Sequence, residues 1–151
     1  MKIAVGCDHR GFFAKEKIKQ LLQARGVEVV DFGTNSPESC DYPDTAFPAA
    51  EDVAKGACER GILFCGTGIG MSISANKVRG IRASLCFDEM MAEMARHHND
   101  ANVLCLPVNF ISDEVMTHVV NKWLDTPFDG GRHERRISKI SEFESRNGHP
   151  H

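Results

Sequence analysis

The segment LFCGTGIGMS, residues 63–72, combines one thiol with a glycine-rich stretch. Cys65 ends an apolar run, and Gly66, Gly68 and Gly70 follow at alternate positions. Glycines so spaced allow unusual backbone dihedral angles and let a ligand approach the main chain. Free N–H groups at the start of a following helix can hold an anion and favour a thiolate, which acts as a base or a nucleophile. The alternative is that Cys65 is an ordinary buried thiol.

Four better-defined patterns do not fit this segment. A dinucleotide-binding G-x-G-x-x-G motif starting at Gly66 requires glycine at position 71, where Met71 stands. A tyrosine-phosphatase-like loop requires arginine at that same position. A Walker A loop requires Gly-Lys followed by Ser or Thr, and a hydrolase elbow requires glycine two residues before the nucleophile, where Leu63 stands. What remains is an anion-holding loop with a thiol at its start.

Two further segments carry groups that exchange protons or hold a sugar. In CDHRG, residues 7–11, Asp8 could hold sugar hydroxyls and His9 could meet a phosphate, or Asp8 could cap the helix that follows. HHND, residues 97–100, ends a predicted helix. A histidine there serves either as a helix C-cap or as a proton-transfer group, because imidazole titrates near neutral pH.

The basic segment GGRHERR, residues 130–136, opens the last predicted helix. Arg132 and Arg136 are four residues apart and share one helix face. Such a pair can bind a phosphate through paired hydrogen bonds, and positive charges near a helix start oppose the helix dipole unless an anion is present. The alternative is a solvated charged surface.

The overall composition narrows the class of protein. The chain has 151 residues, 42% hydrophobic and 26% charged, with a net charge of −3, which favours one globular domain over 1–151 and argues against nucleic-acid binding. No apolar run could cross a membrane, and the start MKIAVGCDHRG is no signal peptide, so we expect no membrane partner and a cytoplasmic location. The six cysteines contain no C-x-x-C pair, which predicts reduced thiols and no metal site.

Short apolar runs alternate with amphipathic stretches along the chain. Expected strands cover 2–6, 27–33, 61–65, 81–87 and 102–107, and expected helices cover 10–25, 44–58, 68–78, 88–98, 112–125 and about 132–145. Pro48 makes the start of the second helix ambiguous, since it fits the first turn or kinks the helix. The 112–125 helix is expected to bury Val115, Val119, Val120, Trp123 and Leu124, and the tail 147–151 is expected to be loose.

This alternation predicts an α/β fold with a parallel sheet. Ligands of such sheets bind outside the carboxyl ends of the strands. The chain places CDHRG (7–11), FGTN (32–35), CGTGIG (65–70), FDE (87–89) and LPVN (106–109) at those ends.

Taken together, these segments resemble the family of ribose-5-phosphate isomerase B and the galactose-6-phosphate isomerase subunits. The resemblance rests on CDHRG at 7–11, DYPD at 41–44, LFCGTGIGMSISANKVRGIRA at 63–83, HHNDANVL at 97–104 and GGRHERRISKI at 130–140. It implies a Rossmann-like three-layer sandwich with a five-stranded parallel sheet. It also implies a homodimer, with a dimer of dimers as a further option, in which the C-terminal helix packs on the partner.

The same resemblance implies a function and a role for each candidate residue. The expected reaction is metal-free and cofactor-free interconversion of D-ribose 5-phosphate and D-ribulose 5-phosphate, as in the non-oxidative pentose phosphate pathway. Cys65 would move the proton, His98 would open the ring, and Thr67 with the amides of Gly66, Gly68, Ile69 and Gly70 would hold the enediolate oxygen. The sugar would contact Asp8, Tyr42 and Asn99, and the phosphate would contact His9, Arg132 and Arg136.

One departure from the family and two alternatives remain at this point. Many family members have an arginine shortly after the fifth strand, offered to the phosphate of the neighbouring site, whereas this chain has Asn109. Other members use a carboxylate elsewhere in place of the thiol, and Cys65 groups this chain with the thiol users. The alternatives are an isomerase for allose or galactose 6-phosphate and a phosphate-binding module without catalysis.

Overall fold

The computed structural model describes residues 1–147. Of the tail 147–151, which was expected to be loose, only Asn147 lies within this range, and it is the C-cap residue of the last helix. All expected strands and helices are present. They are β1 (Lys2–Cys7), α1 (Phe12–Ala24), β2 (Glu28–Asp31), α2 (Pro43–Ala54), β3 (Arg60–Cys65), α3 (Ile69–Asn76), β4 (Ala83–Leu85), α4 (Glu89–Asn99), β5 (Val103–Pro107), α5 (Asp113–Asp125) and α6 (Arg132–Arg146). None of the helices in the described range is long and apolar enough to cross a membrane.

The five strands form one parallel sheet in the order β2-β1-β3-β5-β4, which confirms the predicted fold class. From β1 the chain moves outward to β2 and then returns to β3 on the other side of β1, so the direction of winding reverses between β1 and β3. In open α/β sheets a ligand crevice forms at this switch point, outside the carboxyl ends. The register pairs Cys7 with Phe64, which brings Asp8 and Cys65 to that crevice.

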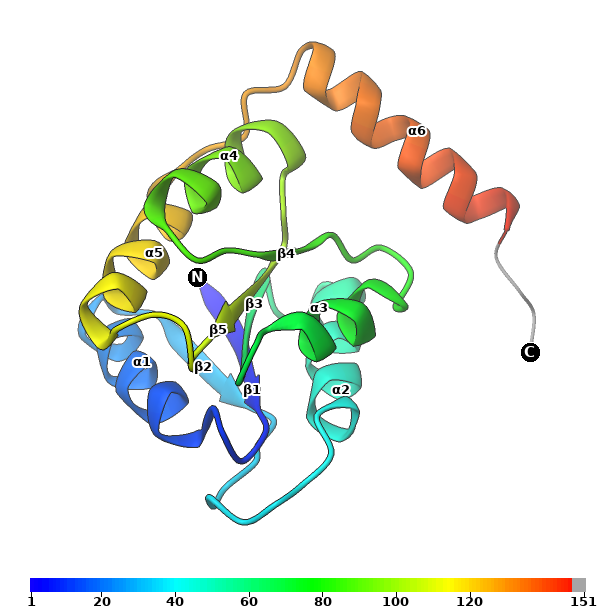
Figure 1. The fold of residues 1–151 in the computed structure, drawn as a ribbon. Coiled ribbons are helices and arrows are strands. Elements are labelled where there is room, and N and C mark those ends of the chain that lie inside the picture. The colour runs from blue at the N-terminus through cyan, green and yellow to red at the C-terminus, as the bar shows by residue number, and fades with distance from the viewer. Residues whose placement is uncertain (148–151) are drawn as a thin grey trace.

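Helices cover both faces of the sheet, giving three layers (Figure 1). On one face α1, α4 and α5 pack on alternate strand residues such as Ile3, Ile62 and Leu104. On the other face α2 and α3 pack on Ala4, Leu63 and Val103. Because both faces are buried, the strands are nearly continuous apolar runs, as parallel strands with covered faces usually are. Figure 1 shows α6 standing apart from both helical layers.

Several boundaries and one core prediction differ from the sequence expectations. Helix α2 ends at Ala54 rather than near 58, because Gly56 adopts a left-handed conformation with φ of 82°, and Pro48 lies inside the helix. Val115 was expected to face the core, but it is exposed, and Met116 is buried instead. The reason is the stripe of α5: Met116, Val119, Val120 and Trp123 follow the i, i+3, i+4, i+7 spacing, which Val115 does not join.

A buried lysine ties α1 to the end of β2. Lys15 is fully buried, and its Nζ donates to Oδ1 and Oδ2 of Asp31 at 2.8 and 2.9 Å and to the carbonyl of Thr34 at 2.7 Å. Burial acts to raise the pKa of Asp31, but hydrogen bonds from Lys15, Lys19 and the Gly33 N–H outweigh it and hold that pKa below its ordinary value. The Thr34 N–H in turn donates to the Cys7 carbonyl, so this network fixes the chain beside the end of β1.

We predict that Lys15→Met lowers the free energy of unfolding by about 3 kcal/mol, because it leaves a partly buried carboxylate short of its main partner. The matched control is Lys17→Met, on the same helix as Lys15. It removes an exposed ion pair with Asp113 of α5 and should lower the free energy of unfolding by less than about 1 kcal/mol. Urea denaturation at fixed protein concentration measures both. Equal losses for the two variants would contradict the role given to the buried pair.

Candidate active site

The glycine-rich loop between β3 and α3 holds the sulfur of Cys65 against a main-chain amide. Cys65 is the last residue of β3 and is only 4% exposed, and its Sγ accepts a hydrogen bond from the Gly68 N–H at 3.2 Å. Thr67 Oγ1 accepts from the Ile69 N–H at 3.1 Å, which tightens the turn into α3. The sulfur therefore faces the amide-rich start of a helix, an environment that stabilises negative charge.

Each of the three glycines is required by a close neighbour. Gly68 has φ of 74°, and a Cβ at that position would lie 2.4 Å from Cδ1 of Leu85. A Cβ on Gly70 would lie 2.7 Å from the ring of Tyr42, and one on Gly66 would lie 2.7 Å from Nδ2 of Asn109. The alternating glycines thus let Tyr42 and the segment after β5 close onto the loop.

The turn after β1 supplies the second wall. Asp8 is buried, and its Oδ1 accepts from the N–H groups of Arg10 and Gly11 at 2.9 and 3.0 Å. Asp8 is therefore not the N-cap of α1, which is Gly11. It stabilises the turn just before the helix, a role close to the capping alternative. His9 accepts a hydrogen bond at Nδ1 from the Cys40 N–H at 3.3 Å, which ties it to the loop that carries Tyr42.

These walls enclose a pocket of about 130 Å³ at the switch point, lined by Asp8, Arg10, Tyr42, Cys65, Gly66, Thr67 and Gly70. Six of the seven residues belong to our predicted site, and Arg10 is the exception. Arg10 was missed because its neighbours Asp8 and His9 carried the pattern, and a single arginine in a turn gives no periodic signal. The pocket is smaller than the 300 Å³ or more typical of complete small-molecule sites.

Four other predicted residues lie elsewhere in the chain, namely His98 and Asn99 on α4 and Arg132 and Arg136 on α6. Asn99 ends α4, and its carbonyl accepts from Nε of Arg82, which precedes β4 at the amino edge of the sheet. Cys65 ends β3 at the carboxyl edge. A strand rises about 3.3 Å per residue, so the two edges lie about 15 Å apart. Within one chain, His98, Asn99, Arg132 and Arg136 therefore do not line the pocket.

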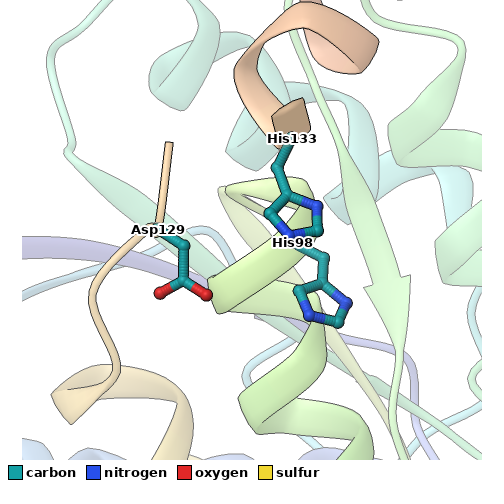
Figure 2. Close-up of side chains that lie close together, drawn as sticks. All are labelled: His98, Asp129 and His133. Atoms are coloured by element: carbon teal, nitrogen blue, oxygen red, sulfur yellow. The ribbon is translucent and has the colours of Figure 1, made fainter. Parts of the chain in front are cut away.

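This second group is organised around two stacked imidazoles, shown in Figure 2. The rings of His98, from α4, and His133, from α6, stack with centroids 4.3 Å apart and 11° between their planes. Burial, the His98 ring and the charges of Arg132 and Arg136 lower the pKa of His133, which favours its neutral form. The stack fixes the start of α6, and with it both arginines, beside the end of α4.

Asp129 completes a cluster whose ligand-type atoms, with those of His98 and His133, all lie within 4.8 Å of one another. Three features disfavour a metal ion in this arrangement. Parallel stacked rings present their nitrogens side by side rather than toward one point, Arg132 and Arg136 add positive charge, and Oδ1 of Asp129 already lies 2.7 Å from Nδ1 of His97. The cluster is better understood as a contact between α4 and α6.

Four other cysteines behave as small apolar side chains. Burial raises the pKa of the Cys7, Cys58 and Cys86 thiols to about 12, with the Asp52 carboxylate adding to the effect at Cys58. Burial raises that of Cys105 well above its ordinary value. These thiols stay protonated near neutral pH, and all six cysteines are free of disulfide bonds, as predicted.

Helix α6 carries an apolar face that nothing in the described chain covers. It has no buried residue, and Ile140 and Phe143 are 55% and 60% exposed. A second apolar region lies between β4 and α4, where a hollow of about 320 Å³ is lined mainly by Leu85, Cys86, Met91, Met94 and Ala95, with Ser84 and Asn99 at its border. Exposed apolar faces of this kind are typical of interaction surfaces.

Comparison with known proteins places these features in a family context. The sequence profile described as Ribose/Galactose Isomerase matches residues 3–140. Ribose-5-phosphate isomerase B of Escherichia coli (strain K12) is 47% identical over 145 residues, covering 96% of this chain and 97% of that protein. A solved structure of Clostridium thermocellum ribose-5-phosphate isomerase B matches with a TM-score of 0.95 and 49% identity, covering 97% and 99% of the two chains. The Mycoplasma genitalium enzyme with bound ribulose-5-phosphate matches with a TM-score of 0.93 and 42% identity, covering 95% and 96%.

We predict that Gly68→Ala destabilises the protein more than Gly26→Ala does. The two glycines have φ of 74° and 78°, so the backbone cost of a Cβ is matched at about 1 kcal/mol, but a Cβ meets nothing within 4 Å at Gly26 and Leu85 at 2.4 Å at Gly68. The overpacking should add about 2 kcal/mol, measured by urea denaturation. A Gly68→Ala variant as stable as Gly26→Ala would show that the loop is not packed as described.

Proposed function

Because this chain belongs to the ribose/galactose isomerase family, we propose that it interconverts D-ribose 5-phosphate and D-ribulose 5-phosphate. The observation that carries the proposal is the sulfur of Cys65, which accepts the Gly68 N–H while lining the pocket at the switch point of the sheet. The names of the Escherichia coli and Mycoplasma genitalium relatives support the choice of a pentose phosphate.

The reaction moves one hydrogen between neighbouring carbons. The Cys65 thiolate removes the proton from C2 of the open-chain aldose, and the electron pair left behind forms the C1–C2 double bond of an enediolate. Negative charge develops on the C1 oxygen, where the hydroxyl of Thr67 and the N–H groups of residues 66–70 are offered as donors. A proton passes from the C2 hydroxyl to the C1 oxygen, the thiol returns its own proton to C1, and the C2 oxygen becomes the ketone, so the thiolate is regenerated.

The other residues bind and prepare the sugar. Asp8 and Tyr42, both in the pocket lining, and Asn99 contact the hydroxyls. His98 opens the furanose ring by proton transfer, and His9, Arg132 and Arg136 bind the phosphate. Paired guanidinium hydrogen bonds suit a phosphate, and the start of α6 presents two of them from one helix face.

These roles require a homodimer, because His98, Asn99, Arg132 and Arg136 do not line the pocket that contains Cys65. A partner subunit can bring its own copies of these residues to the pocket. The uncovered apolar face of α6 and the hollow beside α4 supply surfaces for that contact. The small volume of the pocket in one chain is explained in the same way. The cytoplasmic location expected from the sequence belongs to this proposal as well.

An isomerase for a hexose 6-phosphate remains the second candidate, because the family description names galactose beside ribose. The two candidates are separated by assaying ribose, allose and galactose phosphates side by side with a metal chelator present. A higher kcat/KM for a hexose phosphate would reverse their order. A binding module without catalysis would give no deuterium exchange at C2 of any of these sugars.

We predict that Cys65→Ala lowers kcat at least about 100-fold, since a positioned base contributes 10²–10⁴-fold, while the variant still binds ribose 5-phosphate in calorimetry. The matched control is Cys58→Ala, which removes a buried thiol whose Sγ donates to Asp52 at 3.0 Å, away from the pocket. That control should keep near-normal kcat. Full activity of the Cys65→Ala protein would remove the thiol from the mechanism.

A shared site also predicts complementation between two inactive variants. In a mixed dimer of Cys65→Ala and His98→Ala, one site combines both defects and the other combines an intact Cys65 with the partner's His98. After subunit exchange at equal concentrations, activity should recover to about one quarter of the unmutated protein, because half of the dimers are mixed and each has one intact site. If mixing restores nothing while mass measurements show mixed dimers, His98 and Cys65 do not act across subunits.

A further inference from the structure

Arg10 is held rigidly at the switch point by its backbone. Its N–H donates to Oδ1 of the buried Asp8 at 2.9 Å. The next residue, Gly11, packs so closely on β3 that a Cβ would lie 2.5 Å from the Phe64 carbonyl oxygen. The turn that carries Arg10 is therefore packed directly against the end of β3, which positions the base of the Arg10 side chain.

The Arg10 side chain extends over the glycine-rich loop and meets Asn109 there. A Cβ built on Gly66 would lie 3.0 Å from Cδ and 3.3 Å from Nη1 of Arg10, and 2.7 Å from Nδ2 of Asn109. Both nitrogens therefore lie on the same side of Gly66, over the glycine-rich loop. The position of Asn109 is itself fixed, because its N–H donates to the Gly66 carbonyl at 3.0 Å and the Val108 N–H donates to the Cys65 carbonyl at 3.0 Å.

The Arg10 guanidinium has no acidic partner in the described chain. Arginine–carboxylate pairs within residues 1–147 involve Arg25, Arg82 and Arg96 instead. Asp8, the carboxylate in the same pocket, turns one oxygen toward two backbone N–H groups. Helix α1 begins at Phe12, two residues after Arg10, and has no acidic residue in its first turn. An exposed, unpaired cation beside a positive helix end is an environment that favours an anion.

We propose that Arg10 binds the phosphate group of the sugar phosphate in the pocket of its own chain, beside Asn109, the position where many family members have an arginine. The proposal rests on the function proposed above. Its basis is that the Arg10 side chain lines the pocket together with Cys65, and that Nη1 of Arg10 and Nδ2 of Asn109 both lie over Gly66.

The chemistry of the phosphate gives Arg10 a specific kinetic signature. The phosphate is unchanged by the proton transfer between C1 and C2, so its contact with Arg10 is equally strong in the ground state and in the transition state. Loss of such a contact raises KM and leaves kcat nearly unchanged. Because a guanidinium binds phosphate through charge-assisted hydrogen bonds, the change in KM should be large.

The test begins with Arg10→Ala assayed on ribose 5-phosphate and on unphosphorylated ribose. We expect KM for ribose 5-phosphate to rise about 10- to 100-fold with kcat within about twofold, and kcat/KM for ribose to stay the same. Arg25→Ala, which removes an exposed arginine paired with Asp125, is the control and should leave both substrates unaffected. An equal loss on both sugars, or no change in KM for ribose 5-phosphate, would overturn the proposal.

A double variant tests the replacement directly. Arg10→Ala combined with Asn109→Arg should recover most of the lost affinity, because residue 109 reaches the same point above Gly66. Arg10→Ala combined with Asn109→Lys should recover less, since an ammonium lacks the paired donors of a guanidinium. If Asn109→Arg gives no recovery in a variant that folds as judged by circular dichroism, the two positions do not serve one phosphate site.

Titration of inorganic phosphate by calorimetry separates this proposal from the proposed function. The unmutated protein should bind phosphate, and Arg10→Ala should weaken that binding at least about tenfold, whether or not the protein isomerises ribose 5-phosphate. If phosphate affinity is unchanged by Arg10→Ala, the role of Arg10 fails while the isomerase function stands. If the protein lacks isomerase activity on any sugar phosphate but Arg10→Ala still loses phosphate binding, only the proposed reaction fails.

Discussion

The parallel pairing of β1 with β3 is the constraint on which the site depends. It places the turn after β1 against the loop after β3, and a backbone hydrogen bond from the Asp8 N–H to the Phe64 carbonyl at 3.1 Å continues the pairing beyond the strands. Gly11 and Gly66 lack a Cβ that would push the two turns apart. The carboxylate of Asp8, the guanidinium of Arg10 and the thiol of Cys65 thus line one small pocket, although they come from distant parts of the sequence.

The same topology explains why one chain presents only part of the predicted site. In a parallel α/β fold each helix returns the chain to the amino edge of the sheet, so residues at the end of α4 lie a strand length from residues at the end of β3. The stack of His98 on His133 then fixes the start of α6 at that distant edge. The homodimer proposed above would account for both the uncovered apolar face of α6 and the incomplete pocket.

Both halves of the proposed site carry arginine side chains, one in the pocket and two on α6. In the pocket, the Asp8 carboxylate is directed toward its own backbone, which leaves Arg10 as an unpaired cation above an amide-rich loop. On α6, two arginines share the start of a helix with a histidine whose pKa they help to lower. Both halves therefore offer guanidinium groups, which suit a doubly charged phosphate ester.

The sequence by itself determined the fold class, the order of elements and the identity of the thiol loop, because these follow from local periodicity and from glycine spacing. It also identified Asp8, Tyr42, Cys65 and Thr67, which do meet in the pocket. Boundaries such as the end of α2, and the burial of Met116 rather than Val115, depended on helix geometry that short apolar patterns leave ambiguous. Only the tertiary structure decided that Arg10 and Asn109 converge on Gly66, and that His98 lies away from Cys65 in one chain, because strand order and helix direction bring together residues that no sequence spacing relates.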